Sequence, residues 1–160
     1  MSAPTIRLAS EADKDAIIAL IHALNLYEAE LSADRRTDFP AAEECYAAIR
    51  ARIARDGGAL VVACEDEAIL GVLSLAFAID EPFVQADLRE YGVVTDLVVS
   101  QSHRNRGIGR MLLAEAERRT KERGLARLMI GVLSTNRAAL ASYEKSGFEP
   151  HMVTLSKALG

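Results

Sequence analysis

Three arginines and two glycines gather in one short segment, RNRGIGR, at residues 104–110. No acidic residue occurs from position 100 to position 113, although the whole chain has a net charge of −4. Guanidinium groups form charge-assisted hydrogen bonds with phosphate oxygens, and glycine, which lacks a Cβ, lets a bulky anion approach the main chain closely. If a helix begins here, its free N–H groups and its dipole also attract an anion. The segment is therefore predicted to bind a pyrophosphate.

The spacing of the glycines separates this segment from two common phosphate-binding loops. The dinucleotide fingerprint G-x-G-x-x-G needs a third glycine or alanine that is missing here, and the Walker loop G-x-x-x-x-G-K-[ST] is absent. Residues 104–109 fit the pattern Q/R-x-x-G-x-G/A instead. Farther along the chain, Asn136 is followed by Tyr143 and then by Gly147 and Phe148, in the pattern N-x-x-x-x-x-x-Y-x-x-x-G-F. The two motifs together are more specific than either alone.

The positions of apolar residues predict the elements that hold the first motif. Residues 91–99, YGVVTDLVV, form an apolar run that is typical of a buried strand. After the motif, Ile108, Leu112 and Ala116 recur on one helical face, and Gly124 ends that helix after a basic last turn. A strand that leads through the motif into a helix would place the free N–H groups of the helix beside the bound anion.

The same rules predict the rest of the fold. Ser10 and Asp13 form a capping box that opens a first helix, which fades near Leu31. Further helices are expected at residues 40–56 and 136–146, and further strands at residues 5–9, 59–65, 68–79, 125–133 and 151–159. The interleaved patterns predict an α/β fold of the α+β mixed-sheet type, with about six or seven mostly antiparallel strands and about four helices. A length of 160 residues predicts one domain.

Composition and charge argue against several other classes of protein. The net charge of −4 disfavours a nucleic-acid-binding protein, which usually has an excess of Lys and Arg. The longest apolar run, residues 68–79, is too short to cross a bilayer, and the polar N-terminus is unlike a secretory signal, so a soluble cytoplasmic protein without membrane contact is expected. Cys45 and Cys64 are predicted to be buried thiols, and the spacing of the histidines predicts no metal site.

The two motifs resemble the signatures of the GNAT superfamily of N-acetyltransferases, over residues 94–148. The resemblance implies a GNAT-like acyl-CoA N-acyltransferase fold, with residues 1–160 as one N-acetyltransferase domain. It also implies transfer of an acetyl group from acetyl-CoA, as co-substrate, to a primary amine by direct attack in a ternary complex. The implied partner is a small-molecule or peptide amine, and a homodimer is consistent with the family.

The resemblance also assigns roles to particular residues. Tyr143 stands where the family often places the acid that protonates the departing thiolate. Acetyl-CoA would be bound by main-chain groups of the strand, by the loop and by the asparagine of the second motif, which comprise Leu97, Val98, Val99, Arg104, Asn105, Arg106, Gly107, Ile108, Gly109, Arg110 and Asn136. A backbone N–H near Val98 would stabilise the oxyanion.

The general base is the least defined part of the motif. An amine with a pKa of about 10 arrives protonated at neutral pH, so a base is needed. Many relatives carry a Glu in the strand before the loop, but this chain has Thr95 and then Asp96. Asp96 either deprotonates the amine, directly or through a water, or accepts backbone N–H groups as a structural residue; Glu90 and Tyr91 are weaker alternatives.

Two questions about the partner stay open at this stage. Four acidic residues near the end of the first helix and in the next loop either attract a cationic acceptor or form a solvated face, namely Glu28, Glu30, Asp34 and Asp38. Because this chain has Thr95 where many relatives carry a Glu, a non-catalytic acetyl-CoA-binding sensor or regulatory module is a second hypothesis. A third hypothesis is that the loop binds a different nucleotide.

Overall fold

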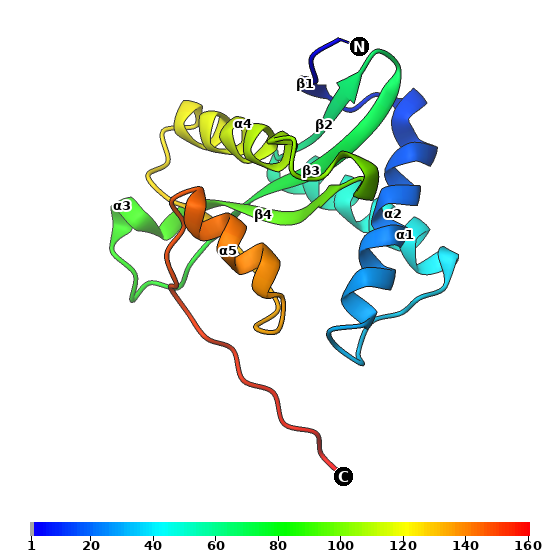
Figure 1. The fold of residues 1–160 in the computed structure, drawn as a ribbon. Coiled ribbons are helices and arrows are strands. Elements are labelled where there is room, and N and C mark those ends of the chain that lie inside the picture. Colours follow the sequence, from blue (N-terminus) through cyan, green and yellow to red (C-terminus); the bar gives the residue numbers. More distant parts are fainter. Residues whose placement is uncertain (1) are drawn as a thin grey trace.

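The computed structural model describes residues 2–160, and within them five strands form one sheet in the order β1-β2-β3-β4-β5 (Figure 1). The strands are β1 (Thr5–Leu8), β2 (Ala59–Glu65), β3 (Ala68–Ile79), β4 (Glu90–Val99) and β5 (Leu128–Ile130). The first four pair antiparallel with their neighbours, and β5 pairs parallel with β4. The predicted α/β class with a mixed, mostly antiparallel sheet is therefore confirmed, with fewer strands than the six or seven expected.

Helices cover both faces of the sheet (Figure 1). They are α1 (Lys14–Ala29), α2 (Phe39–Asp56), α3 (Ala86–Arg89), α4 (Ile108–Glu122) and α5 (Arg137–Lys145), with short 3-10 turns η1 (Glu11–Asp13) and η2 (Gln101–His103). Strand residues alternate between the two faces. Val62 and Val72 pack with α1 and α2, whereas Leu73 and Leu75 pack with α4. The buried strands β2 and β3 thus form the centre of two cores, one on each face.

Local signals in the sequence account for the ends of several elements. The N–H and the hydroxyl of Ser10 both donate to the Asp13 carboxylate, at 2.7 and 2.9 Å, as the capping box predicts. Arg7 of β1 also donates to Asp13, at 2.7 Å, and so joins the first helix to the sheet. Asp38 caps α2 by accepting from Ala41 N at 3.2 Å, and Gly57 ends that helix with a φ of 77°.

The last predicted strand is absent from the single chain. Residues 149–160 have no regular secondary structure, are exposed, and extend away from the rest of the protein (Figure 1). A strand needs a neighbouring strand to pair with its N–H and C=O groups, and this segment has none within residues 2–160. The strand predicted at residues 125–133 is also shorter, since only Leu128–Ile130 pairs.

Other sequence predictions concern the cysteines and the membrane. Cys64 is buried and Cys45 is half-buried, and both are free thiols. The prediction of a buried thiol is thus confirmed for Cys64, whereas Cys45 is only partly covered. Within residues 2–160, no helix has both the length and the apolar character that a membrane span requires.

Candidate functional site

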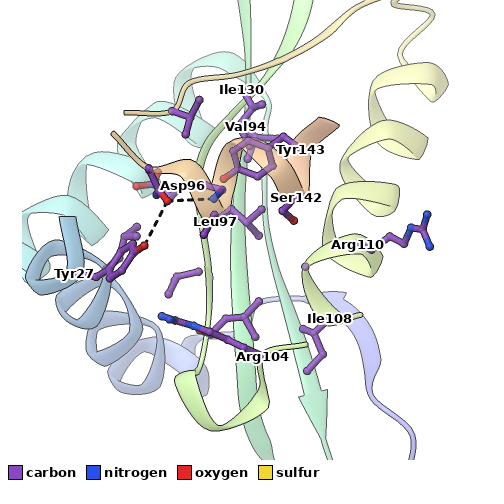
Figure 2. Close-up of a pocket in the computed structure, with 18 of the residues that line it drawn as sticks. Tyr27, Val94, Asp96, Leu97, Arg104, Ile108, Arg110, Ile130, Ser142 and Tyr143 are labelled. Carbon is purple, nitrogen blue, oxygen red and sulfur yellow. Dashed lines mark hydrogen bonds between the residues drawn. The ribbon is translucent and has the colours of Figure 1, made fainter. Parts of the chain in front are cut away.

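A cleft opens in the sheet where β4 and β5 separate. The parallel pairing of these two strands ends at Val94 and Ile130. Beyond that point, residues 95–99 and residues 131–133 line a cleft of about 600 Å³, which α1, α4 and α5 also line (Figure 2). All of the predicted site residues except Arg106 line this cleft. Because strand pairing ends here, main-chain groups of β4 become available to a ligand.

The glycine loop lies at the start of α4. Asn105 and Gly107 adopt positive φ angles of 62° and 79°, which turn the chain between the end of β4 and the helix. Residues 107–110 line the cleft. No heavy atom lies within 4 Å of the place where a Cβ of Gly107 would stand. The first turn of α4, whose N–H groups have no partner inside the helix, is therefore accessible to an anion.

The three arginines of the loop have different surroundings. Arg104 and Arg110 line the cleft, and the Arg104 guanidinium lies 5.6 Å from the centre of the Tyr27 ring. Arg106 forms an ion pair with Glu65 of β2, at 3.2 Å, and does not line the cleft. The structure thus brings two of the three arginines to the site.

A β-bulge at Thr95 decides which way Asp96 points. The register between β3 and β4 shifts between Val94 and Asp96, so Thr95 has no partner across the strand pair. Val94 packs in the core with α4, whereas Val98 packs in the core with α1 and α2. In a regular strand these two side chains would share a face, because they are four residues apart. The bulge therefore places Asp96 on the Val98 side of the sheet, toward α1.

Asp96 is half-buried in the cleft. Its carboxylate accepts a hydrogen bond from the Thr95 hydroxyl at 2.8 Å, and no backbone N–H of residues 2–160 donates to it. Burial raises the pKa of Asp96, while the hydrogen bond from Thr95 acts in the opposite direction. A carboxylate with a raised pKa is a stronger base than an ordinary one. The surroundings of Asp96 thus suit a proton acceptor better than a structural acceptor of backbone N–H groups.

Tyr143 reaches the same cleft from α5. Its ring lies beside Phe148, with the ring centres 6.1 Å apart, and both pack against the core on the α4 side of the sheet. Figure 2 shows the ring of Tyr143 next to Val94 of β4. Burial raises the pKa of the Tyr143 hydroxyl, and the negative charge of Glu28 adds to this. The hydroxyl carries its proton at neutral pH, as any tyrosine does, and the raised pKa makes it a weaker acid than an exposed tyrosine.

Asn136 begins α5 and joins it to α1. Its side-chain oxygen accepts from Ala139 N at 3.1 Å, which caps the helix, and from the Tyr27 hydroxyl at 3.4 Å (Figure 2). The asparagine therefore positions α5, which carries Tyr143. Tyr27 is a cleft residue that the sequence does not reveal, because its helical spacing with apolar residues of α1 indicates an ordinary core position.

Of the acidic residues named from the sequence near the end of α1, Glu28 is the one that lines the cleft. Arg35 donates to it at 2.7 Å. Asp34 pairs with the same arginine at 2.8 Å, and Asp38 pairs with Arg36 at 2.7 Å. Arginines thus pair with three of these four acidic residues, Glu28 included, and Glu28 is the one of them that lines the cleft.

The two weaker candidates for the base lie at the far end of β4. Glu90 forms an ion pair with Arg123 at 3.0 Å, and Tyr91 lies beneath the guanidinium of Arg127 at 4.7 Å. Neither residue lines the cleft. This leaves Asp96 as the carboxylate of β4 that can reach a ligand bound there.

The cleft combines groups of opposite charge with an acid and a base. Arg104, Arg110 and the start of α4 can bind an anion, and Asp96 can attract a cation. Tyr143 can supply a proton. Across residues 2–160, His, Cys, Asp and Glu side chains form no group of three or more that could hold a metal ion. The arrangement suits transfer of a group from an anionic donor to an amine.

Known proteins resemble this chain in sequence. The profile of the acetyltransferase (GNAT) family matches residues 21–148. A streptothricin acetyltransferase from Streptomyces lavendulae is 36% identical over 55 residues, which make up 34% of this chain and 29% of that protein. The aligned part is therefore less than a third of the relative.

Solved structures share the fold over nearly the whole chain. A transcriptional regulator from Bacillus halodurans C-125 is 25% identical, with a TM-score of 0.76, over 98% of this chain and 100% of that chain. An apo aminoglycoside 6'-N-acetyltransferase from Acinetobacter haemolyticus is 18% identical, with a TM-score of 0.70, over 98% of this chain and 99% of that chain. The likeness to the second structure concerns the fold alone.

Proposed function

Because the chain belongs to the acetyltransferase (GNAT) family, we propose that it is an N-acetyltransferase that moves an acetyl group from acetyl-CoA to a primary amine. Residues 1–160 would act as one catalytic domain. The observation that carries this proposal is the cleft between β4 and β5, which has an anion-binding helix start and contains Asp96 and Tyr143. Both motifs of the sequence thus contribute to one cavity.

The phosphates of acetyl-CoA would bind at the start of α4. The N–H groups of residues 107–110 and the guanidinium groups of Arg104 and Arg110 supply the hydrogen bonds. Arg106 is left out of this set because Glu65 holds it. The pantetheine arm would then lie along β4, where the main chain of Leu97, Val98 and Val99 is next to the cleft.

The reaction would be a direct attack by the amine on the thioester. Asp96 accepts a proton from the ammonium group, directly or through a water, and the free amine forms a bond to the acetyl carbon. The N–H of Val98 points toward β3, because Ser100 N, two residues farther along, donates to Leu70 O. The N–H of Leu97 or Val99, on the cleft side of β4, would therefore stabilise the negative charge on the acetyl oxygen.

The C–S bond then breaks, and Tyr143 donates its proton to the sulfur. The nitrogen of the intermediate loses its second proton, which restores the Tyr143 hydroxyl, and Asp96 releases its proton to solvent, so that the products are an acetamide and CoA.

The acceptor is proposed to be a small cationic amine. Glu28 and Asp96 both line the cleft, and Glu28 is already paired with Arg35. Asp96, which forms no ion pair within residues 2–160, is the carboxylate that would attract a positively charged group. The similarity to a streptothricin acetyltransferase supports a small-molecule acceptor.

A panel of primary amines tests the proposed activity. With acetyl-CoA and an accepted amine, the protein should release CoA thiol in proportion to acetylated product, and the Tyr143→Phe variant should release far less. Tight acetyl-CoA binding without thiol release for any amine in a broad panel would favour the second candidate.

That second candidate is a non-catalytic acetyl-CoA-binding module. One observation favours it, namely that a transcriptional regulator shares the fold at 25% identity. It predicts that acetyl-CoA binds and is not consumed. The presence of Asp96 and Tyr143 in one cleft argues for the enzyme instead, since a sensor has no need of a base and an acid placed together.

A further inference from the structure

Ser74 is a buried polar side chain in the middle of β3. The residue is 1% exposed and lies on the same face of the sheet as Val72, which packs with α1 and α2. Its register partner on β4 is Asp96. A buried hydroxyl needs a hydrogen-bond partner, and the one that Ser74 has within residues 2–160 is the Thr95 hydroxyl, at 3.0 Å.

The β-bulge brings two residues of β4 opposite this one serine. Asp96 is the register partner of Ser74, and Thr95 has no partner of its own, so Thr95 and Asp96 together face a single residue of β3. The Thr95 hydroxyl lies between the other two groups, 3.0 Å from Ser74 Oγ and 2.8 Å from Asp96 Oδ2. Both Thr95 and Asp96 line the cleft. A continuous chain of hydrogen bonds therefore leads from the core to the cleft.

The chemistry of the three groups sets the direction of this chain. A hydroxyl carries one proton, so Thr95 cannot donate to Ser74 and to Asp96 at the same time. An ionised carboxylate can only accept, so Thr95 donates to Asp96 and Ser74 donates to Thr95. Oδ2 of Asp96 is thereby occupied, whereas Oδ1 accepts no hydrogen bond from residues 2–160.

We propose that Ser74 and Thr95 are positioning residues, which hold Asp96 by Oδ2 and leave Oδ1 to accept the proton of the amine. Their role rests on the proposed function, in which Asp96 is the base. One proton leaves the ammonium nitrogen and joins Oδ1, while both hydroxyls keep their own protons. Because Ser74 orients Thr95 and Thr95 orients the carboxylate, the base is in place before the amine arrives. The threonine that stands where many relatives carry a Glu would thus serve the base next to it.

Several groups around Asp96 affect its protonation. Burial raises the pKa of Asp96 and the Thr95 hydrogen bond lowers it, with smaller opposite effects from Arg52 of α2, which lowers the pKa, and Glu28 of α1, which raises it. Tyr143 of α5 keeps its proton at acidic and neutral pH. Both charges stay in place when Thr95 is replaced, so a change in the titration of Asp96 would report the lost hydrogen bond.

Thr95→Val and Thr95→Ser form a matched pair of variants. Valine keeps the β-branched shape and loses the hydroxyl, whereas serine keeps the hydroxyl. Thr95→Val should lower kcat about tenfold because the base is less well placed, with KM for acetyl-CoA within about twofold, and Thr95→Ser should recover most of the loss. The acidic limb of the kcat profile should also move to higher pH in Thr95→Val, because the hydrogen bond favours the ionised carboxylate. A merely structural effect of valine would leave that limb in place.

The Ser74→Ala variant tests the inner end of the chain. On its own it should lower kcat by about threefold, because the Thr95 hydroxyl is no longer oriented. In the Thr95→Val background it should have no further effect on kcat, since Ser74 acts through the hydroxyl that is already missing. Equal effects of Ser74→Ala in the two backgrounds would show that Ser74 does not act through Thr95 and would overturn its role.

Titration of the Asp96 carboxyl by carbon NMR of labelled aspartate needs no turnover. The resonance of Asp96 is the one missing from the Asp96→Asn variant, and it should titrate at higher pH in Thr95→Val than in the wild type or in Thr95→Ser. Equal titration in all three proteins, or an unchanged kcat and acidic limb in Thr95→Val, would overturn the role of Thr95 and leave the proposed function intact. A wild type that acetylates no amine would overturn the proposed function, and the titration would still decide whether Thr95 holds Asp96.

Discussion

The phosphate loop and the acceptor side of the cleft are built in different ways. The loop consists of consecutive residues, from Arg104 to Arg110, whose backbone lies between one strand end and one helix start. The acceptor side brings together Glu28 of α1, Asp96 of β4 and Tyr143 of α5, which are far apart in the chain. In the proposed reaction, binding of the donor would thus depend on local structure, whereas the chemistry would depend on how three elements pack.

The largest effect is expected on the acceptor side, at Tyr143. Replacing Tyr143 by Phe removes the hydroxyl and keeps the ring that packs beside Phe148. Loss of a general acid should lower kcat by about 1,000-fold, while the affinity for acetyl-CoA stays within about twofold. Steady-state kinetics and calorimetric titration measure the two quantities. A parallel loss of affinity for acetyl-CoA would mean that Tyr143, on the acceptor side, also contributes to binding the donor.

The sequence predicts more about the loop than about the acceptor side. The pattern at residues 104–109 predicts the anion site because its glycines, its arginines and the helix start are neighbours in the chain, and the family resemblance identifies Asn136 and Tyr143. The directions of the side chains cannot be predicted from the sequence in the same way. The ion pair of Arg106 with Glu65 depends on the approach of β2, which no local pattern reveals.

The bulge at Thr95 shows most clearly what a sequence cannot reveal. A regular strand through residues 94–98 would place Asp96 in the core with α4, beside Val94. The extra residue depends on the pairing with β3, so the direction of Asp96 becomes visible only in the sheet. The segment at residues 151–159 fails as a predicted strand for a related reason, since its pattern is right for pairing but a partner strand is missing from the single chain.

The second effect concerns Asp96. The Asp96→Asn variant keeps the shape of the side chain but cannot accept the proton, so kcat should fall by about 100-fold. In the wild type, burial raises the pKa of Asp96, so activity should fall on acidification at a higher pH than an ordinary aspartate would cause. That acidic limb of the pH profile should disappear in the variant. An unchanged limb would assign the base to another group.

The third effect separates two arginines of the loop side. Arg104→Ala should weaken acetyl-CoA binding about tenfold, because a charge-assisted hydrogen bond to phosphate is lost. Arg106→Ala is the matched control, since Glu65 holds its side chain away from the cleft, and should change the affinity by less than about twofold. Calorimetric titration compares the two. Equal losses would show that Arg106 turns toward the phosphates.

The smallest effect is on stability. The folded protein raises the pKa of Asp96, so ionisation of this group disfavours folding. Its contribution to stability is greatest below the ordinary aspartate pKa and is lost as the pH rises through the raised value. The Asp96→Asn variant should therefore gain stability relative to the wild type as the pH rises from about 4 to neutral. Denaturant unfolding at several pH values measures the difference, and the opposite trend would mean that the folded state favours the carboxylate.

A crystal structure of the protein with acetyl-CoA tests the central claim most directly. The proposed function predicts pyrophosphate oxygens within hydrogen-bonding distance of the N–H groups of residues 107–110, the thioester between β4 and residues 131–133, and its sulfur within about 3–4 Å of the Tyr143 hydroxyl. Acetyl-CoA bound away from the start of α4, or with its thioester pointing out of the cleft, would contradict the claim.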